Sequence, residues 1–176
     1  MTAPLFVIGT VEIAPPDALW VSAIRAAYDP QAAFVDAHFT FVFGARSAAV
    51  DAAKAHVGAV ARQSGPVEWR LSKLQAVGDH VFLIPTDGHA HIRALHRALY
   101  KGPFAADLRH DIAFEPHVTI AALPTAAEAD DLARTLACNP VDIVGRLDRL
   151  ELVAFDGAIL EPLGAFPLSG RGRPRD

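Results

Sequence analysis

The chain has 176 residues, which is the usual length of one domain and is enough to bury a hydrophobic core. Hydrophobic residues make up 52% and charged residues 20% of the chain, a composition that excludes an intrinsically disordered protein. Its 16 basic and 20 acidic residues give a formal net charge of −4, so it lacks the basic excess with which proteins bind long nucleic acids. We expect any nucleic-acid substrate to be short, or to be contacted only at one end.

Cysteine content and hydrophobic patterning predict the compartment in which the protein works. The single cysteine, Cys138, cannot form an intramolecular disulfide or a four-cysteine zinc site. The sequence lacks the run of roughly 18 apolar residues that a membrane-spanning helix requires. Residues 1–4 carry no basic flank typical of a signal peptide. We therefore expect a cytoplasmic monomer with no membrane contact and no implied protein partner.

The first part of the chain predicts a strand, a helix, a second strand and a second helix. Residues 5–13 form an apolar, β-branched run typical of a buried strand. The Pro15-Pro16 pair then opens a helix that ends before Pro30. Residues 39–43 predict a short aromatic strand. Ser47 is a candidate N-cap for the next helix.

The middle of the chain predicts a hairpin followed by a helix. Residues 67–74 and 80–84 are strand candidates, and Gly78-Asp79 between them is a hairpin signal. A helix is predicted to start at residue 87 or 88 and to end at Gly102-Pro103.

The last third predicts another aromatic-type strand, a helix and several strands. Residues 117–123 form the strand, and Thr125 with Glu128 forms a capping box for a helix that ends at Asn139-Pro140. Further strands are predicted over residues 141–144, 147–155 and 165–168. Hairpins mixed with helical crossovers predict an α+β fold with helices packed outside the sheets. We expect one domain over residues 1–168 and a basic, Gly/Pro-rich disordered tail over residues 169–176.

Two short segments repeat one pattern, in which a histidine and a threonine are separated by a single apolar residue inside a predicted strand. They are His38-Phe39-Thr40-Phe41 and His117-Val118-Thr119-Ile120. Side chains alternate between the two faces of a strand, so each segment presents an imidazole and a hydroxyl on one face and buries apolar groups on the other. One such segment alone is more typical of a structural histidine, whereas a matched pair favours a functional site.

The chemistry that suits such a pair is phosphoryl transfer without a metal. An imidazole has an unperturbed pKa of about 6.5, so it gives or accepts a proton near neutrality. Two histidines on opposite sides of a phosphate can act as general base and general acid, while nearby hydroxyls bond the non-bridging oxygens. This requires the two strands to lie side by side or to face each other across a cleft. The sequence leaves open which histidine is the acid and which is the base.

These paired motifs resemble those of the 2H phosphoesterase superfamily, and they are most similar to the bacterial proteins described as 2′-5′ RNA ligases and RNA 2′,3′-cyclic phosphodiesterases. The resemblance continues through residues 81–85, 95–99 and 114–120, and it covers the chain to about Leu168. It implies a bilobal α+β fold with two quasi-symmetric sheet lobes, outer helices and a central cleft. It also implies metal-independent opening of 2′,3′-cyclic or related phosphodiesters of RNA ends or nucleotides, together with a reverse 2′-5′ RNA ligase reaction.

The same resemblance assigns roles to four residues. His38 and His117 would be the catalytic acid–base pair, and Thr40 and Thr119 would bind the substrate phosphate. The chain departs from the family at the last motif position, which is often leucine and is here Phe41 in one motif and Ile120 in the other. Both positions face the predicted core, so the departure leaves the chemistry intact.

Three residues are candidate substrate contacts. Arg46 follows the first motif strand and is within reach of a phosphate, although an arginine at a helix start is more often solvated. Phe6 and Phe82 are candidates for stacking on a nucleobase, although aromatic residues in strands are more often part of the core.

Other chemistries find little support in the sequence. The clustered histidines at positions 89, 91 and 96 have no carboxylate to complete a metal site, and solvated helix positions are the favoured interpretation. The sequence contains no His-Glu-x-x-His motif, no phosphate-binding or dinucleotide glycine motif and no Gly-x-Ser-x-Gly elbow. We expect no metal and no cofactor. The alternative to an enzyme is a non-catalytic module that binds a nucleotide or an RNA end in the same cleft.

Overall fold

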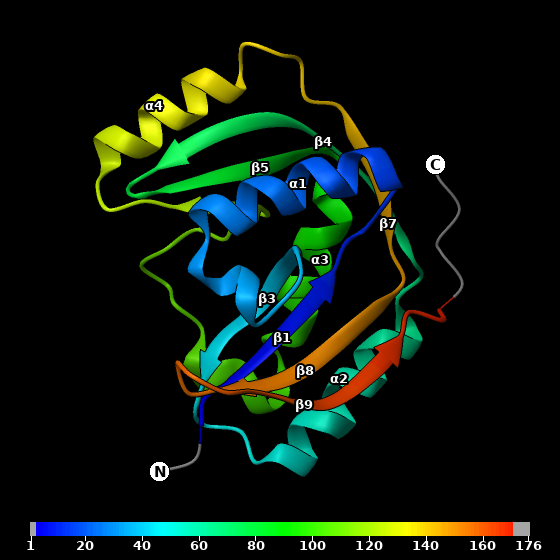
Figure 1. Cartoon of the computed structure of the whole chain (residues 1–176). Helices are drawn as coiled ribbons and strands as arrows, with labels where there is room; N and C mark the ends of the chain where they lie inside the picture. The colour runs from blue at the N-terminus through cyan, green and yellow to red at the C-terminus, as the bar shows by residue number, and fades with distance from the viewer. Residues whose placement is uncertain (1–2, 171–176) are drawn as a thin grey trace.

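The computed structural model describes residues 3–170 and contains helices and strands in one intermixed succession (Figure 1). Its α-helices are α1 (Pro15–Tyr28), α2 (Val50–Gln63), α3 (His89–Leu99) and α4 (Ala126–Leu136), and its 3-10 helices are η1 (Pro30–Ala33) and η2 (Gly102–Asp107). Its strands are β1 (Leu5–Thr10), β2 (Glu12–Ile13), β3 (His38–Ala45), β4 (Val67–Val77), β5 (His80–Asp87), β6 (Val118–Ala122), β7 (Ile143–Leu147), β8 (Arg149–Phe155) and β9 (Leu160–Pro167).

The strands form one antiparallel sheet that curls back on itself. Its order is β2-β7-β4-β5-β6-β3-β1-β8-β9. Strands β1 and β2 are separated only by Val11, yet β1 lies well inside the sheet while β2 pairs with β7 at the far edge. The sheet must therefore curl until this edge returns to the end of β1. Residues 5–13 were predicted as one strand, and the structure divides them at Val11, whose N–H donates to the carbonyl of Ala37 at 3.0 Å.

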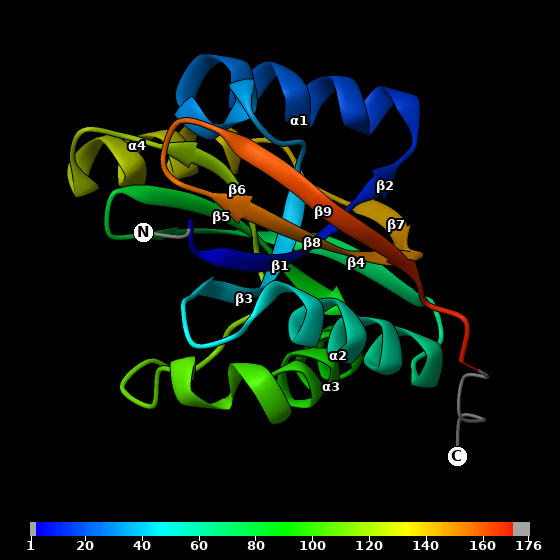
Figure 2. The ribbon, with the colours of Figure 1, turned by 90° about the horizontal axis from the view of Figure 1, so that it is seen from below.

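The sheet consists of two halves that meet at the two motif strands. Strands β3 and β6 pair through Phe39 and Val118, and this is the one register pair between them. One half is β2-β7-β4-β5-β6, with α1 against β6 and α4 against β4 and β5; the other is β3-β1-β8-β9, with α2 against β8 and β9 and α3 against β3. The two helix pairs lie on opposite outer sides of the strands (Figure 2). The predicted α+β fold with two sheet lobes and outer helices is confirmed.

Two consecutive stretches of the chain repeat one order of elements. A strand, a helix, a motif strand and a further helix follow one another as β1, α1, β3, α2 and again as β5, α3, β6, α4. In each set the first strand pairs antiparallel with the motif strand, β1 with β3 and β5 with β6. This internal repetition places the two motifs at equivalent positions on either side of the joint.

The hydrophobic core is built from side chains of the strands and of all four α-helices. Phe39 and Phe41 are about 1% exposed, and the Phe39 ring meets the Trp69 ring edge to face with 6.0 Å between centroids. A side chain at Gly9 would place its Cβ 2.4 Å from the Leu147 side chain, so any larger residue here would force that buried leucine to shift. Because alternate residues of β3 face opposite ways, the histidine and threonine of the first motif lie on the face turned away from this core.

Local sequence signals predicted the β4–β5 turn and the start of α4 correctly, and the start of α2 wrongly. The β4–β5 hairpin turns at Gly78, whose φ of 59° is the left-handed conformation that such a turn needs. Helix α4 begins after Thr125, whose Oγ1 accepts a hydrogen bond from the N–H of Glu128 at 3.2 Å, so the predicted cap is confirmed. Helix α2 begins after Ala49 instead of Ser47, because the Ser47 hydroxyl is bonded to the Asp107 carboxylate.

The C-terminal strands differ from the prediction in their limits. Leu147 ends β7 and does not open β8, which starts at Arg149. Strand β9 spans Leu160–Pro167, where only residues 165–168 were predicted. Ser169 and Gly170, which were assigned to the predicted tail, are bonded to the body of the protein: their N–H groups donate to the carbonyls of Ala61 and Ser64, at the end of α2, at 3.2 and 3.0 Å. Residues 171–176, the rest of the predicted tail, lie outside the described residues.

Over residues 3–170, no helix is long and apolar enough to span a membrane.

Candidate active site

The two histidine motifs lie on adjacent antiparallel strands. The register that pairs Phe39 with Val118 places His38 beside Thr119 and Thr40 beside His117, all four on one face of the sheet. Directly opposite residues of such strands have Cβ atoms about 4.5–5.5 Å apart, and diagonal residues about 7–8 Å apart. The two histidines form the diagonal pair. Segments nearly half the chain apart in sequence thus supply one cluster of two imidazoles and two hydroxyls.

Both imidazoles are held by the same local contact. The Nδ1 atom of His38 lies 2.7 Å from the carbonyl oxygen of Asp36, and the Nδ1 atom of His117 lies 2.7 Å from that of Glu115. A carbonyl only accepts, so Nδ1 carries the proton in each neutral ring and Nε2 carries the lone pair. Within residues 3–170 no hydrogen bond occupies either Nε2 atom. Each ring therefore offers a free proton acceptor on the motif face.

Burial shifts the titration of both rings in the same direction. Burial lowers the pKa of His38, and the nearby charge of Arg25 lowers it further. The hydrogen bond to the Asp36 carbonyl and the charges of Asp29 and Glu151 oppose this shift. The imidazoles are thus biased toward their neutral, proton-accepting form.

The second histidine has a different set of neighbours. Burial is again the main cause that lowers the pKa of His117; the bond to the Glu115 carbonyl opposes it, and the nearby His80 ring adds to it. The Phe82 ring stacks on the imidazole of His117, with 4.0 Å between centroids and 23° between planes. Phe82 was a candidate for stacking on a base, and in the structure it fixes the plane of the His117 ring.

An ion pair secures the segment that precedes each motif strand. Ahead of β3, the buried Arg25 donates from Nε to Asp29 Oδ2 at 2.9 Å, and the other carboxylate oxygen of Asp29 accepts the N–H of Gln31 at 2.9 Å. Ahead of β6, the Glu115 carboxylate lies 2.9 Å from His89 Nε2 and 3.7 Å from the Arg93 guanidinium. These residues share no sequence motif, which is why sequence reasoning did not find them.

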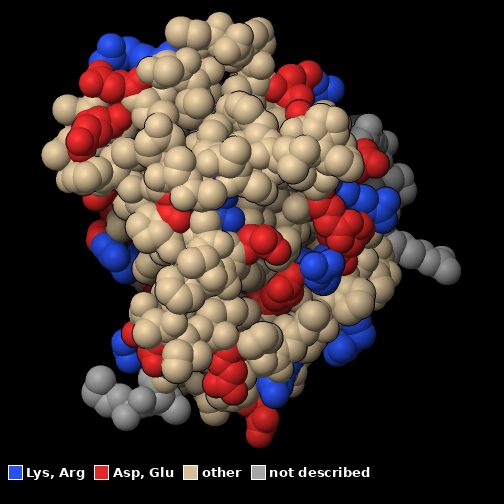
Figure 3. All heavy atoms as spheres, viewed as in Figure 1, with Lys and Arg blue, Asp and Glu red and all other residues tan. Residues whose placement is uncertain are grey.

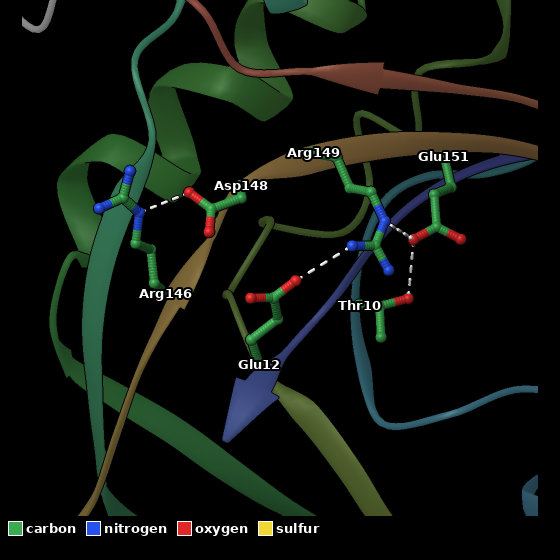
Figure 4. A network of polar contacts seen from close by, with 6 residues as sticks. All are labelled: Thr10, Glu12, Arg146, Asp148, Arg149 and Glu151. Carbon is green, nitrogen blue, oxygen red and sulfur yellow. Dashed lines mark hydrogen bonds and ion pairs between the residues drawn. The ribbon is translucent and has the colours of Figure 1, made fainter. Parts of the chain in front are cut away.

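A polar network extends from the His38 side across the sheet (Figure 4). Thr10, which lies opposite His38 in the β1–β3 register, donates to Glu151 at 3.0 Å. Arg149 donates from Nε to the same Glu151 oxygen at 2.9 Å and from Nη1 to Glu12 at 3.0 Å. The network links β1, β2 and β8, and its one guanidinium is shared between two carboxylates.

A pocket opens beside the first motif and includes one of the predicted substrate contacts. Phe6 lies in its wall, next to His38 and Thr40. Arg46 is at the opposite end of β3 and lines a separate cavity with Leu5 and Glu161. The structure thus brings Phe6, but not Arg46, to the first motif histidine, His38, and Arg46 is not part of the proposed site.

The histidines of α3 do not form a metal site. His89 contacts Glu115, and His96 bonds the carbonyl of Phe41 through Nδ1 at 2.9 Å while its ring stacks on Phe114 at 3.7 Å. Over residues 3–170, no three His, Cys, Asp or Glu side chains are grouped so as to hold a metal ion.

Comparison with known proteins places this fold and these motifs in a family. The model of the 2'-5' RNA ligase superfamily matches residues 13–158, a span that contains both motif segments. A protein of Bacillus pumilus (strain SAFR-032) named "Putative phosphoesterase" is 26% identical over 136 residues, which are 75% of this chain and 78% of that protein.

Solved structures share the fold at lower identity. Escherichia coli LigT in complex with NADP+ superposes with a TM-score of 0.64 at 17% identity, covering 96% of this chain and 99% of that one. The same protein in complex with 3'-AMP gives a TM-score of 0.63 at 16% identity and the same coverage. Kluyveromyces marxianus Usb1 gives 0.56 at 10% identity, covering 95% of this chain and 99% of the other. Because the family model matches most of this chain, the chain belongs to the 2'-5' RNA ligase superfamily, the 2H phosphoesterases.

Proposed function

We propose that the protein is a metal-independent phosphoesterase that opens 2′,3′-cyclic phosphodiesters of nucleotides or RNA ends, with His38 and His117 as its acid–base pair. The pairing of the two motif strands at Phe39 and Val118 carries the proposal, because it gives both imidazoles one shared face. The family and the fold support a phosphoesterase. The ligands named for E. coli LigT, NADP+ and 3'-AMP, are nucleotides and favour a substrate of that kind.

The proposed reaction is an in-line displacement at phosphorus. The neutral Nε2 of one histidine removes a proton from water as the water oxygen bonds to phosphorus. The protonated Nε2 of the other donates its proton to the ribose oxygen as the P–O bond breaks, so the ring opens to a phosphate monoester. The hydroxyls of Thr40 and Thr119 donate to the non-bridging oxygens, where charge accumulates in the transition state. Within the described residues no hydrogen bond engages either hydroxyl.

The same chemistry with a different nucleophile would carry out ligation. When the 5′-hydroxyl of an RNA replaces water, its oxygen bonds to phosphorus, the bond to the 3′-oxygen breaks, and a 2′-5′ phosphodiester forms. The quasi-twofold repetition of the motif leaves the roles of acid and base interchangeable between the two histidines.

The first prediction is that each histidine is required for turnover. Purified protein incubated with a nucleoside 2′,3′-cyclic phosphate should yield a monophosphate, and His38→Ala or His117→Ala should lower the rate by about 10²–10⁴-fold. His91→Ala, an exposed histidine of α3, is the matched control and should keep the full rate. Chelation with EDTA should leave the rate unchanged. Full activity in either motif variant, with circular dichroism showing a native fold, would remove that histidine from the mechanism.

The alternative function predicts a different outcome of the same experiment. A non-catalytic module would bind the cyclic nucleotide and return it chemically unchanged. Stoichiometric binding without product over many hours would favour that module over the enzyme.

A further inference from the structure

We propose that the substrate is a single nucleoside cyclic phosphate, whose base occupies the pocket beside His38, and that the site selects it over the cyclic end of an RNA chain. This inference rests on the proposed function and narrows its substrate class.

The pocket is an apolar space that adjoins one motif. It is lined by side chains from β1, β3, β8 and β9 and from the segment that follows α1, namely Phe6, Ile8, Gln31, Phe34, Val35, His38, Thr40, Phe43, Val153, Phe155 and Leu160. Apart from the motif pair, Gln31 is the only polar side chain among these residues. An uncharged group that offers amide-type hydrogen-bonding atoms at its edge fits this lining, and a charged one does not.

Four phenylalanines form a continuous aromatic wall in the pocket. Phe6 meets Phe43 and Phe155 edge to face, with 5.3 and 6.4 Å between centroids, and Phe155 meets Phe34 at 5.9 Å. The two ends of this wall are open to solvent, with Phe43 71% and Phe34 46% exposed. Large aromatic side chains left this accessible at the mouth of a pocket provide faces on which a planar base can stack.

A bulge in β3 determines which face of the sheet carries the Phe43 ring. In the β1–β3 ladder, Val7 lies opposite Val42 and Ile8 opposite Thr40, so Phe41 is an extra residue on β3. Strict alternation would send Phe43 to the core face, where Phe41 already lies. The bulge turns Phe43 to the face of Thr40, and bulges of this kind are common beside functional sites.

The charges beside the site disfavour additional phosphates. Arg149 is shared by Glu12 and Glu151, so this network holds two carboxylates against one guanidinium, and the nearby Arg146 is separately paired with Asp148 (Figure 4). A further phosphate reaching this side of His38 meets no free cation of the network.

Four other basic side chains lie on elements that do not line the pocket. Lys54 and Arg62 lie on α2 and Arg97 on α3, on the other side of the strands from α1 (Figure 2). Lys73 is on β4, which is separated from β6 by β5. Red and blue side chains are also interspersed over the face in Figure 3, with no continuous basic surface. Proteins that follow an RNA backbone need such a surface, so extra nucleotides should add little affinity here.

The test compares three substrates that differ in what is attached to the cyclic phosphate. They are adenosine 2′,3′-cyclic phosphate, an RNA hexanucleotide ending in that same group, and glycerol 1,2-cyclic phosphate, which has no base. We expect kcat/KM for the mononucleotide to equal or exceed that for the hexanucleotide and to exceed that for the glycerol ester by about 10-fold or more. A 10-fold preference for the hexanucleotide, or equal use of the glycerol ester, would overturn the inference while leaving the proposed phosphoesterase function standing.

Two variants test the pocket itself. Phe43→Ser and Phe34→Ser should raise KM for adenosine 2′,3′-cyclic phosphate by about 10-fold with little change in kcat, and should not affect the glycerol ester. Leu19→Ser is the matched control, because Leu19 is 72% exposed on α1 and does not line the pocket. Unchanged KM in both phenylalanine variants would contradict the base site.

A binding measurement separates the two proposals. If none of the three esters is hydrolysed, the proposed function fails, and calorimetry with adenosine 3′-monophosphate still decides the pocket. Weaker binding in Phe43→Ser than in Leu19→Ser would support the base site, whereas equal binding would reject it.

Discussion

The two motif histidines have the same backbone contact and different neighbours. In each ring the Nδ1 proton is held by the carbonyl two residues earlier, at 2.7 Å, which directs Nε2 toward the shared face. Around His38 lie the charges of Arg25, Asp29 and Glu151, whereas His117 is packed under the Phe82 ring. Equivalent orientation supports a common task for the two rings.

The lowered pKa values predict the pH dependence of the reaction. Burial lowers the pKa of both His38 and His117 below the ordinary value of about 6.5. Turnover needs one ring neutral and one protonated. At higher pH the protonated ring is lost, and at very low pH the neutral ring is lost. The profile of kcat/KM, which reports the free enzyme, should be bell-shaped with its maximum below about pH 6.5. A rate that climbs steadily from pH 6.5 to 8 would contradict the shifts.

At the scale of elements, the site depends on how the segments ahead of β3 and β6 are held. The loop before β3 carries the carbonyl that orients His38, and it is anchored at its start by the buried pair of Arg25 and Asp29. Asp29 also caps η1, which leads to the pocket residue Phe34. One ion pair therefore supports both the orientation of the first histidine and one wall of the pocket.

Breaking this pair should cost more stability than breaking an exposed one. Asp29→Asn leaves the charge of Arg25 buried without a partner, since both side chains are at most 5% exposed. We expect the free energy of unfolding, measured in urea, to fall by about 3–5 kcal/mol. Asp131→Asn is the control: it removes the exposed pair with Arg134 on α4 and should cost about 0–1 kcal/mol. Similar losses in the two variants would contradict the role given to the buried pair.

Local patterns predicted elements well where only neighbouring residues decide the structure. Thr125 caps α4 through Glu128, three residues away, and both residues are visible in the sequence. Ser47 was predicted to cap a helix and instead bonds Asp107, which a local pattern does not reveal. Likewise, alternation alone gives no sign of the extra residue at Phe41 that turns Phe43 outward. Long-range contacts decided both cases.

At the scale of the whole molecule, the site exists because two halves of one sheet meet at a single register pair. The motif residues could be selected from the sequence because the pattern of histidine and threonine occurs twice. Their meeting required the pairing of Phe39 with Val118, which joins segments far apart in the chain. The pocket was less predictable, because its lining comes from β1, β3, β8, β9 and the segment after α1. Of these residues, only Phe6 and the first motif were singled out beforehand.

The most direct test is a crystal structure of the protein with a nucleoside 3′-monophosphate, the kind of product that ring opening yields. The account predicts one phosphate between the two rings, with oxygens about 2.7–3.2 Å from Nε2 of both His38 and His117. A phosphate held by only one of these histidines, or rings that turn away from each other around the bound ligand, would contradict it.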